Sequence, residues 1–121
     1  MLVIHRAQKQ ILARDLFHRW ILEHVARFFP DRCAALGPAG VRAAVEDATR
    51  AARELGFDDR DDIGQFIDLT FMFGPGFPAA EHLWARRVLE DPSEPDPRRR
   101  MNRLYRAALR QLTPGGERPR S

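Results

Sequence analysis

The side chains best suited to chemistry in this sequence are arginines near its C-terminus. Four of them recur at steps of four, three and four residues, which places them on one face of a helix: Arg99, Arg103, Arg106 and Arg110. A guanidinium group donates several hydrogen bonds from a planar fork that fits carboxylates and phosphates. The row predicts a surface that binds an acidic protein. The alternatives are a surface that follows a nucleic-acid backbone and a solvated outer face without a partner.

The charge of the chain is divided between its two ends. From Arg98 to Ser121 there are eight arginines and one acidic residue, Glu117, which gives a formal charge of +7. Residues 1–97 hold twelve basic and sixteen acidic side chains, a formal charge of −4. A division of this kind attracts an oppositely charged partner or docks one part of the chain on another. No aromatic residue interleaves the arginine row, which weakens the case for single-stranded nucleic acid.

Phe77 is the second candidate for contact with a partner. It stands in the turn Gly74-Pro75-Gly76-Phe77-Pro78, which cannot continue a helix. An exposed aromatic ring on a rigid turn makes a strong anchor for a partner protein. The alternative is that the ring folds back and fills the core.

The remaining reactive side chains show no spacing typical of catalysis or metal binding. The run Asp58–Asp62 has Arg60 at its centre and lacks the alternating ligands of a calcium loop. It suits a helix N-terminus, and it could attract the arginine-rich helix of the same molecule or of a second copy. Four histidines also lack the spacing of zinc ligands: His5, His18, His24 and His82. We therefore expect a protein without enzymatic activity, cofactor or metal.

Cysteine usage and hydropathy suggest where the protein works. Cys33 is the single cysteine, so no internal disulfide can form, which fits a reducing compartment. No apolar run approaches the roughly 20 residues of a membrane span. The apolar start, residues 1–4, is too short for a signal peptide. We expect a soluble, cytoplasmic protein whose Cys33 is a buried, inert thiol.

Proline and glycine divide the sequence into segments of helical length. Apolar residues at three- and four-residue steps predict main helices over about residues 6–28, 39–55, 61–73, 79–89 and 96–112, and one short helix over 32–36. No alternating strand pattern exceeds four residues. We predict an all-α fold, a compact bundle of five main helices plus one short helix. A single domain over residues 1–112 precedes a flexible, disordered basic tail over residues 113–121.

The helical pattern also predicts which side chains face the core. In the last helix the apolar positions lie opposite the arginine row: Met101, Leu104, Tyr105, Ala108, Leu109 and Leu112. Trp20 and Trp84 are expected to be core anchors, since large aromatic rings gain most from burial. The apolar faces of five helices could exceed what one core hides, and a homodimer would cover the excess.

Several short segments follow one another over most of the chain: FFPDRC with ALG from Phe28, LGF from Leu55, DLTFMFG from Asp68, WA from Trp84 and RMNRLY from Arg100. They resemble small helical bacterial proteins found near type VI secretion spike and effector genes. The resemblance implies an accessory role as adaptor, chaperone or immunity protein, and it assigns no functional residue. With the charge pattern it favours a non-enzymatic protein-binding module. The alternative is a nucleic-acid-binding protein that uses the arginine-rich helix.

Overall fold

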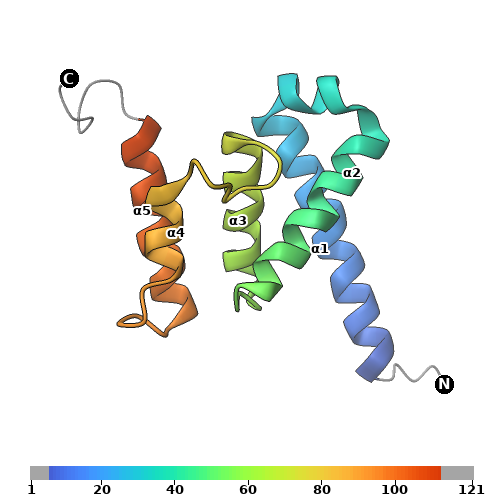
Figure 1. The fold of residues 1–121 in the computed structure, drawn as a ribbon. Helices are drawn as coiled ribbons and strands as arrows, with labels where there is room; N and C mark the ends of the chain where they lie inside the picture. The colour runs from blue at the N-terminus through green and yellow to red at the C-terminus, as the bar shows by residue number, and fades with distance from the viewer. Residues whose placement is uncertain (1–5, 113–121) are drawn as a thin grey trace. The chain divides into compact units, whose positions relative to one another are not determined.

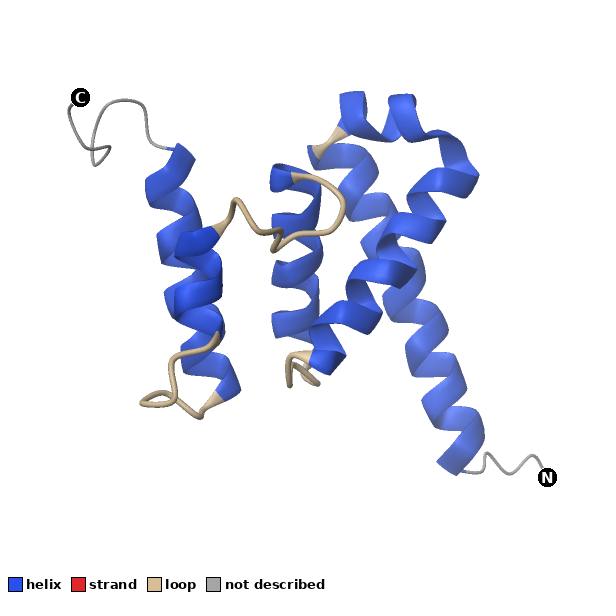
Figure 2. Cartoon of the chain, viewed as in Figure 1, coloured by secondary structure: helices blue, strands red, loops and turns tan. Residues whose placement is uncertain are grey.

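In the computed structural model, the backbone is described for residues 6–112 and the side chains for residues 14–112. Five helices follow one another, α1 (Arg6–Phe28), α2 (Pro30–Glu54), α3 (Arg60–Phe73), α4 (Leu83–Leu89) and α5 (Pro97–Leu112) (Figure 1). Turns and loops join them, and the described residues contain no strand (Figure 2). The predicted all-α fold is therefore confirmed. The predicted tail over residues 113–121 lies outside the described residues.

The chain divides into two compact units between Val45 and Glu46, inside α2. The prediction of a single domain over residues 1–112 stays a prediction. Each unit is described by itself below. Within residues 6–112, no helix is both long enough and apolar enough to cross a membrane.

In the first unit, α2 follows α1 almost without a break and then bends. The N–H of Phe29 donates to the carbonyl of Val25 at 2.8 Å, and the N–H of Cys33 donates to the carbonyl of Phe29 at 3.0 Å. Gly37 interrupts α2 with φ 75° and ψ 166°, a conformation open essentially to glycine alone. The predicted boundary between the short helix and the longer one therefore exists, as a kink inside α2.

Fewer side chains of α1 are buried than we expected from the sequence, because Trp20 is not among them. Ile21 and Val25 are fully buried. Trp20 is 53% exposed, so the prediction that it anchors the core is wrong. Adjacent residues of a helix point about 100° apart. Trp20 therefore lies beside the face that Ile21 and Val25 bury.

In the second unit, α5 packs against both α3 and α4. The core is built from apolar side chains of these helices and the segments between them: Phe57, Ile63, Phe66, Ile67, Leu69, Phe77, Ala85, Met101, Leu104 and Ala108. Gly56 takes a positive φ of 95° at the end of α2, and the N–H of Phe57 returns to the carbonyl of Ala52 at 2.9 Å. This glycine cap turns Phe57 inward, where its side chain is fully buried.

Two helix starts are set by local hydrogen bonds. The side chain of Asp59 caps α3 by accepting from the N–H of Asp61 at 2.8 Å. The predicted helix over residues 79–89 begins later, at Leu83. Before it, the N–H of Ala79 donates to Nδ1 of His82 at 2.9 Å, and the N–H of His82 donates to the carbonyl of Ala79 at 2.9 Å. These bonds close a turn that replaces the first predicted helical turn.

Candidate functional site

The arginine row is carried by α5, whose two faces differ sharply. Its buried residues are all apolar, namely Met101, Leu104, Ala107 and Ala108. Pro97 starts the helix, and Asp96 caps it by accepting from the N–H of Arg99 at 3.0 Å. The side chains of Arg99, Arg103, Arg106 and Arg110 are all exposed on the opposite face.

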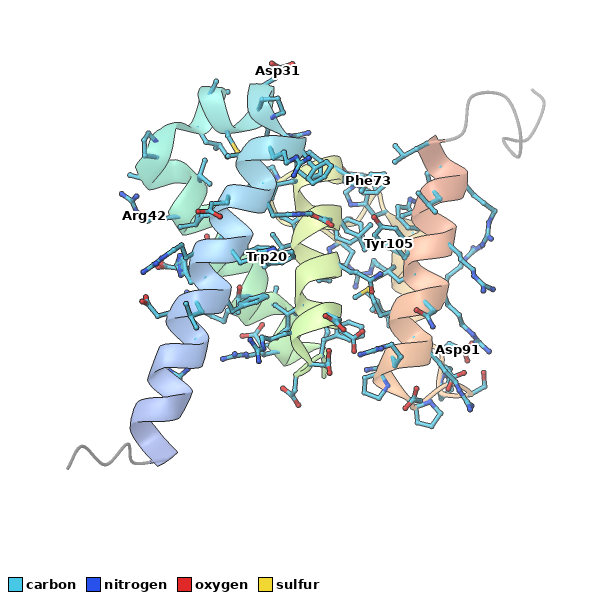
Figure 3. All side chains as sticks on the ribbon, turned by 180° about the vertical axis from the view of Figure 1, so that it is seen from behind. Trp20, Asp31, Arg42, Phe73, Asp91 and Tyr105 are labelled. Carbon is cyan, nitrogen blue, oxygen red and sulfur yellow. The ribbon has the colours of Figure 1, made fainter. Side chains whose placement is uncertain are left out.

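Arg103 is held by carboxylates of its own chain. Its Nη1 lies 3.3 Å from Oδ2 of Asp91, and its Nη2 lies 3.6 Å from Oε1 of Glu94. Asp91 belongs to the loop that precedes α5 and lies beside the first turns of that helix (Figure 3). Arg103 therefore ties this loop to α5.

Ser93 orients the carboxylate that Arg103 contacts. The Oγ of Ser93 donates to Oδ1 of Asp91 at 2.7 Å, and the N–H of Ser93 donates to the same oxygen at 2.9 Å. These hydrogen bonds, with a smaller contribution from Arg103, hold the pKa of Asp91 below its usual value. The carboxylate is thus ionised and fixed in position for the ion pair.

Arg98 holds α5 to the start of α3. Its guanidinium group contacts three carboxylates, at 3.1 Å to Asp59, 3.9 Å to Asp61 and 3.0 Å to Asp62. Asp62 is buried, and burial raises its pKa while Arg98 opposes that rise. The expected roles of the acidic run, helix capping and attraction of the arginine-rich helix within one molecule, are both confirmed.

Arg100 also stabilises the fold through contacts within its own chain. Its Nη2 donates to the carbonyl of Leu55 at 3.0 Å, and its guanidinium group stacks over the ring of Phe57 at 5.3 Å. The carbonyl lies at the end of α2, where helix carbonyls lack intrahelical partners. Neither Arg98 nor Arg100 belongs to the predicted row, although Arg98 precedes its first member and Arg100 follows it.

Three arginines of the row have no acidic partner among the described side chains. Among residues 14–112, no carboxylate lies within 4.0 Å of the guanidinium groups of Arg99, Arg106 or Arg110. Leu109 and Leu112 lie on the adjacent side of the same helix and are also exposed, at 47% and 50%. The outward surface of α5 thus offers guanidinium groups next to apolar side chains. We call Arg99, Arg106, Leu109 and Arg110 the α5 face.

Phe77 does not belong to this surface. It is only 3% exposed, so its prediction as an exposed anchor is wrong. Its ring lies 5.4 Å from that of Phe73, 5.8 Å from Phe66 and 5.9 Å from Trp84. Gly76, with φ 83°, allows the chain to turn back. Burying the ring among other aromatic side chains lowers the free energy, which favours the buried position over the exposed one. The alternative, in which Phe77 fills the core, is the one observed.

Cys33, which we expected to be buried, is only half-buried. Burial raises the pKa of Cys33, whose Sγ–H donates to the carbonyl of Val25 at 3.4 Å. A thiol in this setting is a weak nucleophile. Over the part of the chain with described side chains, no group of three or more histidine, cysteine, aspartate or glutamate residues is arranged to hold a metal.

Comparisons with known proteins add no relative: no family model, no curated protein and no solved structure matches this chain.

Proposed function

We propose that this protein is a non-enzymatic binding module that contacts an acidic protein through the α5 face. One observation carries the proposal. Arg98 and Arg103 find carboxylates of their own chain, whereas Arg99, Arg106 and Arg110 have none within 4.0 Å among the described side chains. Three guanidinium groups on one helix face, with no carboxylate of the described residues beside them, are suited to carboxylates supplied by another molecule.

The apolar side chains beside the arginines favour a protein over a nucleic acid. Leu109 is about half exposed between the buried side of α5 and Arg106. A phosphate backbone offers nothing to a leucine side chain, whereas an amphipathic protein segment offers both carboxylates and apolar contacts. A partner helix with acidic residues on the edge of its apolar face has the required chemistry.

We extend the proposal to the cellular role that the resemblance suggests. The module would act in the cytoplasm as an accessory protein of a secretion or effector system, as adaptor, chaperone or immunity protein. The positive α5 face would speed encounter with a negatively charged effector or secretion component. The specific role depends on that partner.

Affinity enrichment from the source cells tests the proposal with two matched variants. The first carries Arg99→Glu, Arg106→Glu and Arg110→Glu. The control carries Arg32→Glu, Arg42→Glu and Arg53→Glu, which are exposed arginines of α2, so that the net charge of the two variants is equal. Lysates are treated with nuclease, and recovered proteins are quantified by mass spectrometry.

We expect the wild type and the control to recover the same acidic protein. The α5 variant should recover it at least tenfold less, because three rim contacts of about 0.5 kcal/mol each become repulsive. Equal recovery by the α5 variant and the control would reject the α5 face. Recovery of proteins only when the nuclease is omitted would instead identify a nucleic-acid-binding protein.

A further inference from the structure

The helix α1 exposes a row of large apolar side chains. Leu16, Trp20 and Phe28 recur at multiples of four residues, and they are 53%, 53% and 60% exposed. They lie on one side of the helix, because residues four apart are neighbours on a helix surface. Exposed apolar groups that gather in this way mark interaction sites more often than single exposed ones do.

Contacts between rings hold this row in place. The ring centroids are 6.1 Å apart for Phe17 and Trp20, 5.1 Å for Trp20 and His24, and 4.8 Å for His24 and Phe28. The guanidinium group of Arg27 lies over the ring of Phe28 at 5.5 Å. Side chains fixed before binding lose little conformational entropy on binding. We call Leu16, Phe17, Trp20, His24 and Phe28 the α1 ladder.

A row of charges of alternating sign runs beside the α1 ladder. Asp15, Arg19, Glu23 and Arg27 are all exposed, and each precedes a ladder residue by one position. They therefore form a flank about 100° around the helix from the ladder. Asp15 and Arg19 contact each other at 3.7 Å, but both are exposed, so this pair contributes little and can exchange partners.

The order of signs on this flank shows what can lie against it. Read from Asp15 to Arg27, the signs are minus, plus, minus, plus; read in reverse, every sign is opposite. When a two-fold axis relates two antiparallel copies of α1, the charged flank of one copy lies against the same flank of the other copy. The residues of the second flank then run in the reverse order. Symmetric dimers use such self-complementary surfaces. A parallel pair would not bring the two charged flanks together.

We infer that α1 is a homodimer interface in which two copies of the α1 ladder pack antiparallel. Arg19 then lies opposite the partner subunit's Glu23, and Asp15 lies opposite the partner subunit's Arg27. The flank has no net charge, so it offers no attraction to a uniformly acidic or basic partner. This interface lies on a different helix from the α5 face and does not depend on the proposed function.

Two charge variants of the full chain provide the test. The positive-flank variant carries Asp15→Arg and Glu23→Arg, and the negative-flank variant carries Arg19→Glu and Arg27→Glu. Analytical ultracentrifugation measures the association of each alone and of an equimolar mixture. Helix content from circular dichroism verifies that each variant folds. Trp20→Ala, at the natural charges, tests the ladder independently of the flank.

The wild type should dimerise with a dissociation constant on the order of 10 µM, because one helix pair makes a small interface. Each charge variant alone should associate at least tenfold more weakly, and their mixture should form a heterodimer at wild-type strength. Trp20→Ala should also weaken the dimer tenfold or more. A wild type that stays monomeric at about 200 µM, or unchanged association in these variants, would overturn the inference. So would a mixture of the two folded charge variants that fails to form the heterodimer.

Discussion

Replacing Phe77 with alanine measures how much the aromatic cluster of the second unit stabilises the fold. Phe77 is almost fully buried among Phe66, Phe73 and Trp84. A buried phenylalanine removes roughly 150–200 Å² of apolar surface from water, which at about 25 cal/mol per Å² is worth about 4 kcal/mol. The alanine variant also leaves a cavity that the surrounding rings fill only in part. We therefore expect a loss of about 3–5 kcal/mol in the free energy of unfolding.

Urea unfolding followed by fluorescence gives this quantity directly. In a Trp20→Phe background, Trp84 is the single tryptophan, and it lies within the cluster, 5.9 Å from the ring of Phe77. At the expected loss, the melting temperature should fall by about 10–20 °C for a chain of this length. The Trp84 signal reports on the second unit, which contains Phe77, so a substitution in the first unit should leave it nearly unchanged.

Phe28→Ala is the matched control, because it removes the same side chain from an exposed position. It should cost less than about 1 kcal/mol when measured at about 1 µM, where a weak dimer is dissociated. Equal unfolding midpoints for Phe77→Ala and Phe28→Ala would refute the assignment of Phe77 to the core. The exposed-anchor prediction for Phe77 would then return.

The pKa values of two carboxylates are shifted in opposite directions, upward for Asp62 and downward for Asp91. Burial raises the pKa of Asp62 in the folded state above its value in the unfolded state. Between these two pKa values the folded state binds more protons than the unfolded state does. The free energy of unfolding therefore falls as pH rises through this range. In urea unfolding, the difference in stability between Asp62→Asn and the wild type should therefore shift in favour of the variant as pH rises above the ordinary pKa of aspartate. A difference that stays constant with pH would contradict this expectation. For Asp91, Ser93→Ala removes the hydroxyl that contributes most to its lowered pKa, so the pKa should rise in a carbon NMR titration of the carboxyl group. An unchanged titration would show that Ser93 does not stabilise the ionised form.

Much of the fold could be predicted because its boundaries depend on local chemistry. Gly37 and Gly56 take positive φ angles that favour glycine, and their positions in the sequence identified the breaks in or after α2. Helical spacing predicted the apolar face of α5 in part: Met101, Leu104 and Ala108 are buried, whereas Leu109 and Leu112 are exposed. The start of α4 was missed because the side chain of His82 accepts a hydrogen bond from Ala79, and this turn competes with the helix.

The candidate site was predicted less completely because spacing identifies a helix face but not its neighbours. Arg103 has the same spacing as Arg99 and Arg106, yet Asp91 and Glu94 reach it from the preceding loop. Trp20 fits the apolar period of α1, but periodicity does not say how wide a strip the rest of the protein covers. Phe77 sits between glycine and proline, where sequence alone allows either burial or exposure. In each case, contacts between residues distant in sequence or across a turn decide the outcome.

Site-specific photo-crosslinking tests the protein-binding role of the α5 face most directly. Asn102 is exposed on α5 between Arg99 and Leu109 around the helix, so a photoreactive amino acid there should touch a bound partner without removing an arginine. The same group in place of Arg42, on α2, is the control. We predict a nuclease-resistant adduct with one acidic protein from position 102 and none with that protein from position 42. Equal labelling from both positions, or an adduct that nuclease removes, would contradict the proposal.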